Sequence, residues 1–152
     1  MGEKSQAQAT LRAAANNDSV YFLIEVLDEK IASGDIATLL IAPVTTNNQL
    51  TNGARRFVVS HSGLVSTNGY NGGWVAGNPQ ANIRATYQGT IAQDSDTDTG
   101  YVVEMAIARS KLTIVSGKIL VNFSITDTVS GEDAIFSTTS TNTAKWIEVS
   151  GL

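Results

Sequence analysis

Residues 94–112, DSDTDTGYVVEMAIARSKL, contain the segment that decides the fold. Aspartate first alternates with Ser or Thr, and a glycine then opens the run GYVVEMAIA (100–108). An apolar run of this kind, rich in Val, Tyr and Ile and preceded by a turn, predicts a β-strand. If the odd-numbered side chains from Tyr101 to Ile107 face the core, Glu104 lies on the outer surface of the sheet.

Similar short runs recur along the chain, separated by clusters of Gly, Asn, Asp and Ser. Helix formers never gather into a long amphipathic segment, although RSKL (109–112) suggests a single helical turn. This pattern is typical of an all-β fold, and we expect one domain, residues 1–152, folded as an antiparallel, jelly-roll-like β-sandwich of about ten strands. The expected strands are 8–15, 20–28, 35–43, 54–60, 63–66, 82–92, 100–108, 118–127, 132–138 and 145–151.

The composition excludes several classes of site. There is no cysteine, so thiol catalysis and cysteine-ligated zinc are ruled out. His61 is the single histidine, which argues against a Ser-His-Asp triad. A net charge of -4 offers no attraction to nucleic acid, and no apolar run reaches the ~18 residues of a membrane helix. We therefore expect no enzyme, no nucleic-acid partner and no membrane insertion.

The order of the motifs resembles carbohydrate-binding module family 9 and the wider DOMON-like superfamily. The segments that carry the resemblance are VYFLIEVLDEKI (20–31), DIATLLIAP (35–43), DTGYVVEMAIARSKL (98–112), KILVNFSITD (118–127) and KWIEVSG (145–151). The chain departs from the family pattern at Ala108 and Arg109, where the family usually has Pro-Trp, and it begins at the first hairpin.

The resemblance implies a sandwich of two antiparallel sheets that binds a polysaccharide or oligosaccharide without catalysis. It also implies an accessory module, tethered to other domains of a larger, bacterial, secreted or cell-surface protein that degrades glycans. The signal for secretion is expected outside this sequence. Two alternatives are a structural or adhesion domain without a sugar site and, since some relatives bind haem, a haem module. A haem would need Met105 with His61 or Lys111, but Met105 is expected to face the core.

Aromatic residues are the first candidates for a sugar site, because the C–H face of a pyranose packs on an aromatic ring. Trp74 lies in the loop NGYNGGW (68–74) together with Tyr70, and Trp146 opens the closing strand. We expect both tryptophans to be partly exposed. The alternative is that each one packs against the core.

Polar groups would supply the hydrogen bonds to sugar hydroxyls. The candidates are Asn71 beside Trp74, Asn142 shortly before Trp146, Arg109 at the end of the 100–108 strand, and Glu104 within that strand. The alternatives are turn asparagines, a solvated arginine, and a Glu104 that pairs with an arginine on the neighbouring strand.

The acidic loop suggests calcium as a cofactor, with Asp94, Asp96 and Asp98 as ligands. It is not an EF-hand loop, because glycine comes seventh and position twelve is Met105. The alternative is a solvated turn whose aspartates bond to the local backbone. The aspartates at other strand ends are interpreted as turn residues; they are Asp28, Asp35 and Asp127.

Overall fold

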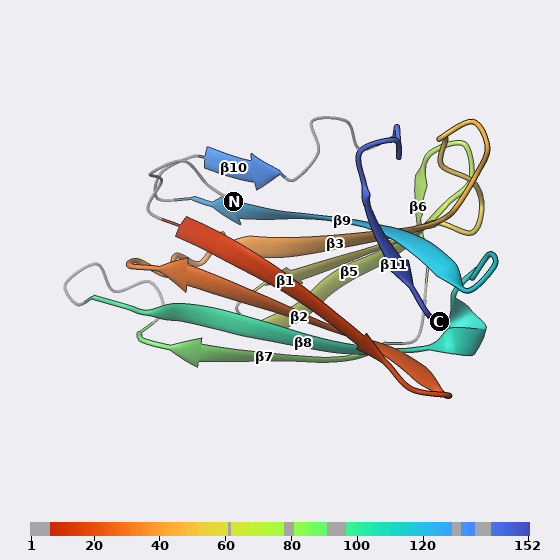
Figure 1. The fold of residues 1–152 in the computed structure, drawn as a ribbon. Coiled ribbons are helices and arrows are strands. Elements are labelled where there is room, and N and C mark those ends of the chain that lie inside the picture. Colours follow the sequence, from red (N-terminus) through yellow and green to blue (C-terminus); the bar gives the residue numbers. More distant parts are fainter. Residues whose placement is uncertain (1–6, 61, 78–80, 91–96, 129–131, 136–140) are drawn as a thin grey trace.

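Two antiparallel β-sheets pack face to face in a sandwich (Figure 1). The structure is a computed structural model and describes residues 7–60, 62–77, 81–90, 97–128, 132–135 and 141–152. The small sheet has the order β1-β2-β8-β7, and the large sheet has the order β10-β9-β3-β4-β5-β6 with β11 also paired to β9. This architecture confirms the predicted antiparallel sandwich.

The elements follow the expected strands closely. The small sheet consists of β1 (Ala7–Ala15), β2 (Ser19–Asp28), β7 (Ala81–Gln88) and β8 (Gly100–Ala108). The large sheet consists of β3 (Ile36–Pro43), β4 (Arg55–Ser60), β5 (Gly63–Tyr70), β6 (Trp74–Ala76), β9 (Lys118–Asp127), β10 (Glu132–Ile135) and β11 (Ile147–Ser150). The expected helical turn is the 3-10 helix η1 (Arg109–Lys111). The short strand β6 was not expected.

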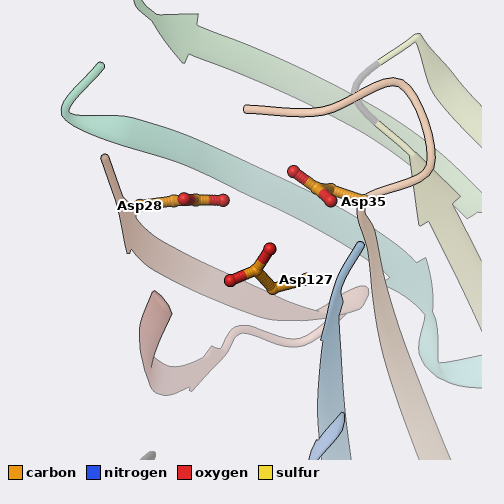
Figure 2. A group of neighbouring side chains, drawn as sticks. All are labelled: Asp28, Asp35 and Asp127. Carbon is orange, nitrogen blue, oxygen red and sulfur yellow. The ribbon is translucent and has the colours of Figure 1, made fainter. Parts of the chain in front are cut away.

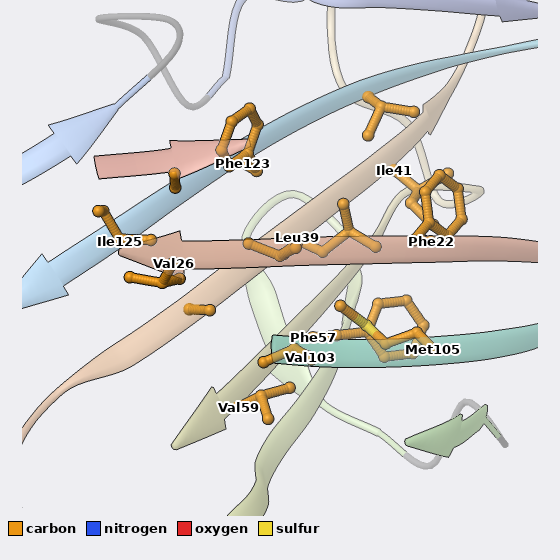
Figure 3. Close-up of a cluster of buried hydrophobic side chains, with 14 of the residues drawn as sticks. Phe22, Val26, Leu39, Ile41, Phe57, Val59, Val103, Met105, Phe123 and Ile125 are labelled. Atoms are coloured by element: carbon orange, nitrogen blue, oxygen red, sulfur yellow. The ribbon is translucent and has the colours of Figure 1, made fainter. Parts of the chain in front are cut away.

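The main core fills the space between the sheets (Figure 3). Alternate residues of β8, from Tyr101 to Ile107, are buried in it, while Glu104 is exposed. Met105 therefore faces inward as expected, where it packs among Phe22, Phe57 and other apolar side chains. Lys111 is exposed in η1, and His61 lies outside the described residues.

The glycine that begins β8 is required by a close approach of two strands. Gly100 has φ +113°, and a Cβ there would lie 1.9 Å from the backbone oxygen of Val26 in β2. Only glycine combines that backbone conformation with so small a separation. The chain can therefore leave the acidic loop and pair with β2 at once.

Asp98, the last aspartate of the acidic loop, ties neighbouring loops together. Its carboxylate accepts hydrogen bonds from the backbone N–H groups of Ile31 and Thr90, both at 2.8 Å. Its own N–H donates to the carbonyl of Glu29 at 3.0 Å. Asp98 is buried, unlike the solvated turn aspartate of the alternative interpretation. The other two candidate calcium ligands, Asp94 and Asp96, lie outside the described residues.

Candidate functional site

A second apolar cluster lies on the outer face of the large sheet. Along β3 the side chains of Leu39 and Ile41 enter the main core, so those of Leu40 and Ala42 face the opposite side. The buried members of this outer cluster are Leu40, Ala42, Leu50, Ala54, Leu120 and Trp146. Val44, Tyr70 and Trp74 pack against it and are partly exposed. The fold thus brings both tryptophans and Tyr70 together.

Trp74 is held at the margin of this cluster by a tight hairpin. Tyr70 at the end of β5 and Trp74 at the start of β6 are register partners, and the N–H of Asn71 donates to the carbonyl of Gly73 at 2.8 Å. Gly72 has φ +70°, which suits glycine in this turn. The rings of Tyr70 and Trp74 meet edge to face, with centroids 5.4 Å apart and planes at 77°. Trp74 is half-buried, as expected.

A cation and an amide complete this surface, and sequence reasoning missed both. The guanidinium carbon of Arg56 lies 5.1 Å from the centroid of the Trp74 ring. Its Nε donates to Oδ1 of Asn68, which lies directly across from it on β5, at 3.1 Å. Burial lowers the pKa of the Arg56 guanidinium, although such a group stays charged. The Arg56 side chain is therefore held over the ring by two contacts.

Trp146 is buried, with 6% of its surface exposed, so the expectation that it would be partly exposed is wrong. Its backbone N–H donates to the carbonyl of Thr143 at 3.0 Å, just before β11 begins. The side chain packs in the outer cluster with the leucines. In β11 the side chains alternate between the two faces of the sheet. Val149 packs on the main core, and Glu148 forms an ion pair with Lys118 at 2.9 Å.

The two candidate asparagines lie in loops beside the aromatic cluster. Asn71 is exposed in the β5–β6 turn. Asn142 is exposed and forms an isolated β-bridge with Gln49, next to Leu50 of the cluster. Its Oδ1 accepts the N–H of Ala144 at 2.9 Å. Both residues thus take part in hydrogen bonds of their local turns.

Glu104 and Arg109 do not join this group. Glu104 lies on the outer face of the small sheet, between Leu23 and Arg84 in the strand register, where it lines a groove of about 650 Å³. Arg109 binds the β1–β2 turn: its N–H donates to the carbonyl of Asp18 at 2.9 Å, and its Nη1 donates to that of Asn16 at 3.1 Å. The expectation that Glu104 belongs to one sugar site with Trp74 is therefore wrong, because Glu104 lies on the opposite face of the sandwich. For Arg109 the contacts support a turn-stabilising role.

No protein-family model matches the sequence, and no curated relative matches it either. Within the described residues, no helix has the length and apolar character needed to cross a membrane. Two solved structures are similar over 97% of this chain, each with a TM-score of 0.70 and 16% identity. Each is a carbohydrate binding module family 9 (CBM9) from Caldicellulosiruptor kristjanssonii. One is in complex with cellotriose and the other with glucose. The alignments cover 76% and 78% of those chains. This chain therefore has the fold of a family 9 carbohydrate-binding module, as its motif order implied.

Proposed function

We propose that this protein is a non-catalytic carbohydrate-binding module that binds sugar at the Trp74 face. The observation that supports it is the set of Tyr70, Trp74, Arg56 and Asn68 gathered at one end of the large sheet. The fold adds support, because its solved relatives carry cellotriose and glucose. The wider setting is a bacterial, secreted or cell-surface protein that degrades glycans, within the DOMON-like group of folds.

The arrangement suits a neutral sugar. The accessible part of the Trp74 ring offers an apolar surface for the C–H face of a pyranose. Trp146 and the leucines beneath it act as a rigid floor rather than as a second platform. A floor of this kind keeps the Trp74 ring in place before the sugar arrives, which lowers the entropic cost of binding.

Arg56 is the proposed main donor to sugar hydroxyls. A guanidinium carries five N–H donors, and Nε alone is used in a described contact, to Asn68. The terminal nitrogens are thus available beside the ring. Asn71 and Asn142, in the loops that flank the cluster, are the proposed additional partners.

The experiment is isothermal titration calorimetry with cellotriose, the ligand of one solved relative, on the native chain and two variants. Trp74→Ala should weaken binding roughly tenfold or more, since stacking on an aromatic face contributes on the order of 1–2 kcal/mol. Tyr21→Ala is the matched control, because Tyr21 is an exposed aromatic residue in the groove of the small sheet. It should bind as the native chain does.

Four other outcomes would each displace the proposal. Loss of binding in Tyr21→Ala alone would move the site to the groove on the small sheet. Unchanged affinity in a folded Trp74→Ala would remove the aromatic platform. If the native chain binds nothing on a glycan array, the structural or adhesion domain becomes the better account. A visible haem band in the purified protein would favour the haem alternative.

A further inference from the structure

A pocket of about 430 Å³ lies beside the helical turn that follows β8. One wall comes from η1 and the residues after it, with Ser110, Lys111 and Thr113 among its members. The other wall comes from the large sheet, where Arg55 of β4 and Gly69 of β5 are register partners. Small-molecule sites usually have volumes of about 300–1,000 Å³, so this pocket is large enough for such a ligand. We call it the basic pocket.

The basic pocket contains cations and no acid. Arg55 and Lys111 line it, and its lining residues include no aspartate or glutamate. Within the described part of the chain, neither of these side chains forms an ion pair. Acidic residues outnumber basic ones in the sequence, 14 against 10, so composition alone does not explain two cations without a carboxylate. The pocket is therefore complementary to a negatively charged group.

Several donors of the basic pocket are available to a ligand. Among the described residues, the Lys111 ammonium and the hydroxyls of Ser110 and Thr113 make no hydrogen bond. The Arg55 guanidinium uses only Nη1, which donates to the carbonyls of Asn52 and Ala54, each at 2.8 Å. A guanidinium has five N–H groups, so the three on Nε and Nη2 are left over. Such donors form strong, charge-assisted hydrogen bonds with an anionic oxygen.

Contacts within the protein hold the walls of the basic pocket in place. Gly77, which lines it, is tied to Thr67 of β5. The Thr67 hydroxyl donates to the Gly77 carbonyl at 2.6 Å, and the Gly77 N–H donates to the Thr67 carbonyl at 3.1 Å. On the other wall, a Cβ on Gly53 would lie 2.6 Å from Oγ1 of Thr113, so these two segments are in close contact. Positioned walls reduce the entropic cost of binding.

The basic pocket and the Trp74 face lie on opposite sides of the same strands. Arg56 and Asn68 belong to the Trp74 face. Their neighbours in sequence, Arg55 and Gly69, line the basic pocket. Adjacent residues of a strand point to opposite faces of the sheet, which accounts for this division. The pocket is thus a separate site that shares no lining side chain with the sugar face.

The buried acidic side chains that lie closest together are at the other end of the sandwich (Figure 2). They are Asp28, Asp35 and Asp127, and the first two accept hydrogen bonds from backbone N–H groups of their own turns, as expected for turn residues. The end of β8 that leads into η1 pairs with Ser19, at the opposite end of β2 from Asp28. At about 3.3 Å per strand residue this separation is roughly 30 Å, far beyond the reach of an ion pair. These carboxylates therefore do not neutralise the basic pocket.

We propose that the basic pocket binds the anionic group, a carboxylate or a sulfate ester, of an acidic sugar. Arg55 and Lys111 would donate to the anionic oxygens. The hydroxyls of Ser110 and Thr113 both donate and accept, which suits the hydroxyls of a sugar ring. The pocket also has room for that ring beside the anionic group. The sugar part of this assignment rests on the function proposed above, whereas the anionic part rests on the two cations.

The test is a titration of the isotope-labelled native chain with glucuronate and with glucose sulfate, followed by NMR. Both compounds carry the negative charge, and the tighter of the two identifies the anionic group. The backbone amide signals of Gly69, Gly77 and Lys111 should shift, because these residues line the pocket. Neutral glucose should not shift them. The shifts should persist in Trp74→Ala and should require more ligand as the salt concentration rises.

Variants of the two cations give an independent readout. Arg55→Gln and Lys111→Gln should each weaken binding of the acidic sugar about fivefold or more. Arg84→Gln removes the same charge from an exposed residue of β7 and is the matched control, which should bind as the native chain does. All three variants should keep the native affinity for cellotriose, so failure of the basic pocket and failure of the sugar face give different results.

Three results would overturn this assignment. One is the absence of shifts at the pocket residues with either acidic sugar. Another is an equal shift with glucose, which would show that charge is not the basis of binding. Inorganic sulfate that binds as tightly as the acidic sugars would overturn the sugar part and leave a simple anion site.

Discussion

Trp146→Ala should destabilise the protein much more than Trp74→Ala. Trp146 is 6% exposed and packs on Leu40, Leu50 and Leu120, so its truncation leaves a cavity under the outer cluster. A buried Trp→Ala change costs about 3–5 kcal/mol. Trp74 is half-buried at the margin of the cluster, and its truncation opens onto solvent. We expect a loss of about 1–2 kcal/mol there.

Urea unfolding at equilibrium measures both values, with unchanged m-values as the check that only stability has changed. For a chain of this size, 3–5 kcal/mol corresponds to a melting temperature lower by roughly 6–20 °C. Tyr21→Ala, on the opposite face, is the control for loss of an exposed ring. If Trp146→Ala unfolds no more easily than Trp74→Ala, Trp146 is not the floor of the cluster, and the division between floor and platform fails.

Three further results are expected. Arg56→Met should weaken cellotriose binding several-fold with little loss of stability, as measured by calorimetry, because the donors leave while the stem is kept. Gly100→Ala should cost about 3 kcal/mol or more in urea unfolding, since a Cβ would lie 1.9 Å from the Val26 oxygen. Burial raises the pKa of Asp28 to about 6 from its ordinary 3.8, so the folded state binds the proton more tightly than the unfolded state. The free energy of unfolding should then fall by up to about 3 kcal/mol as the pH rises from about 4 to about 6, measured by unfolding at several pH values.

The strands could be predicted because their signal is local. In β8, buried and exposed side chains alternate just as the letters of GYVVEMAIA do, and the glycine before them marks the turn. β6 was missed for the same reason. It spans only Trp74–Ala76, too short for alternation to show, and its sequence context is rich in glycine.

The surroundings of the tryptophans could be predicted only in part, because they depend on strand pairing. Alternation in ARRFVVS (54–60) places Arg56 opposite to Phe57, on the outer face. Arg56 lies over Trp74 because β4 pairs with β5 and β5 pairs with β6. These pairings cannot be predicted from the residues of one strand. Trp146 was expected to be partly exposed, but it is buried in a cluster that includes Leu50, which is distant in sequence.

The acidic residues show the same limit more strongly. The DSDTDT loop was proposed as a calcium site because its aspartates are close in sequence. The carboxylate of Asp98 instead accepts hydrogen bonds from two backbone N–H groups. Asp28 and Asp127 stand at unremarkable strand ends, 99 residues apart by their numbers, and become neighbours only when β2 and β9 end at the same edge of the sandwich. Clustering in sequence is thus a poor guide to clustering in a β-sandwich, where adjacent positions face opposite ways.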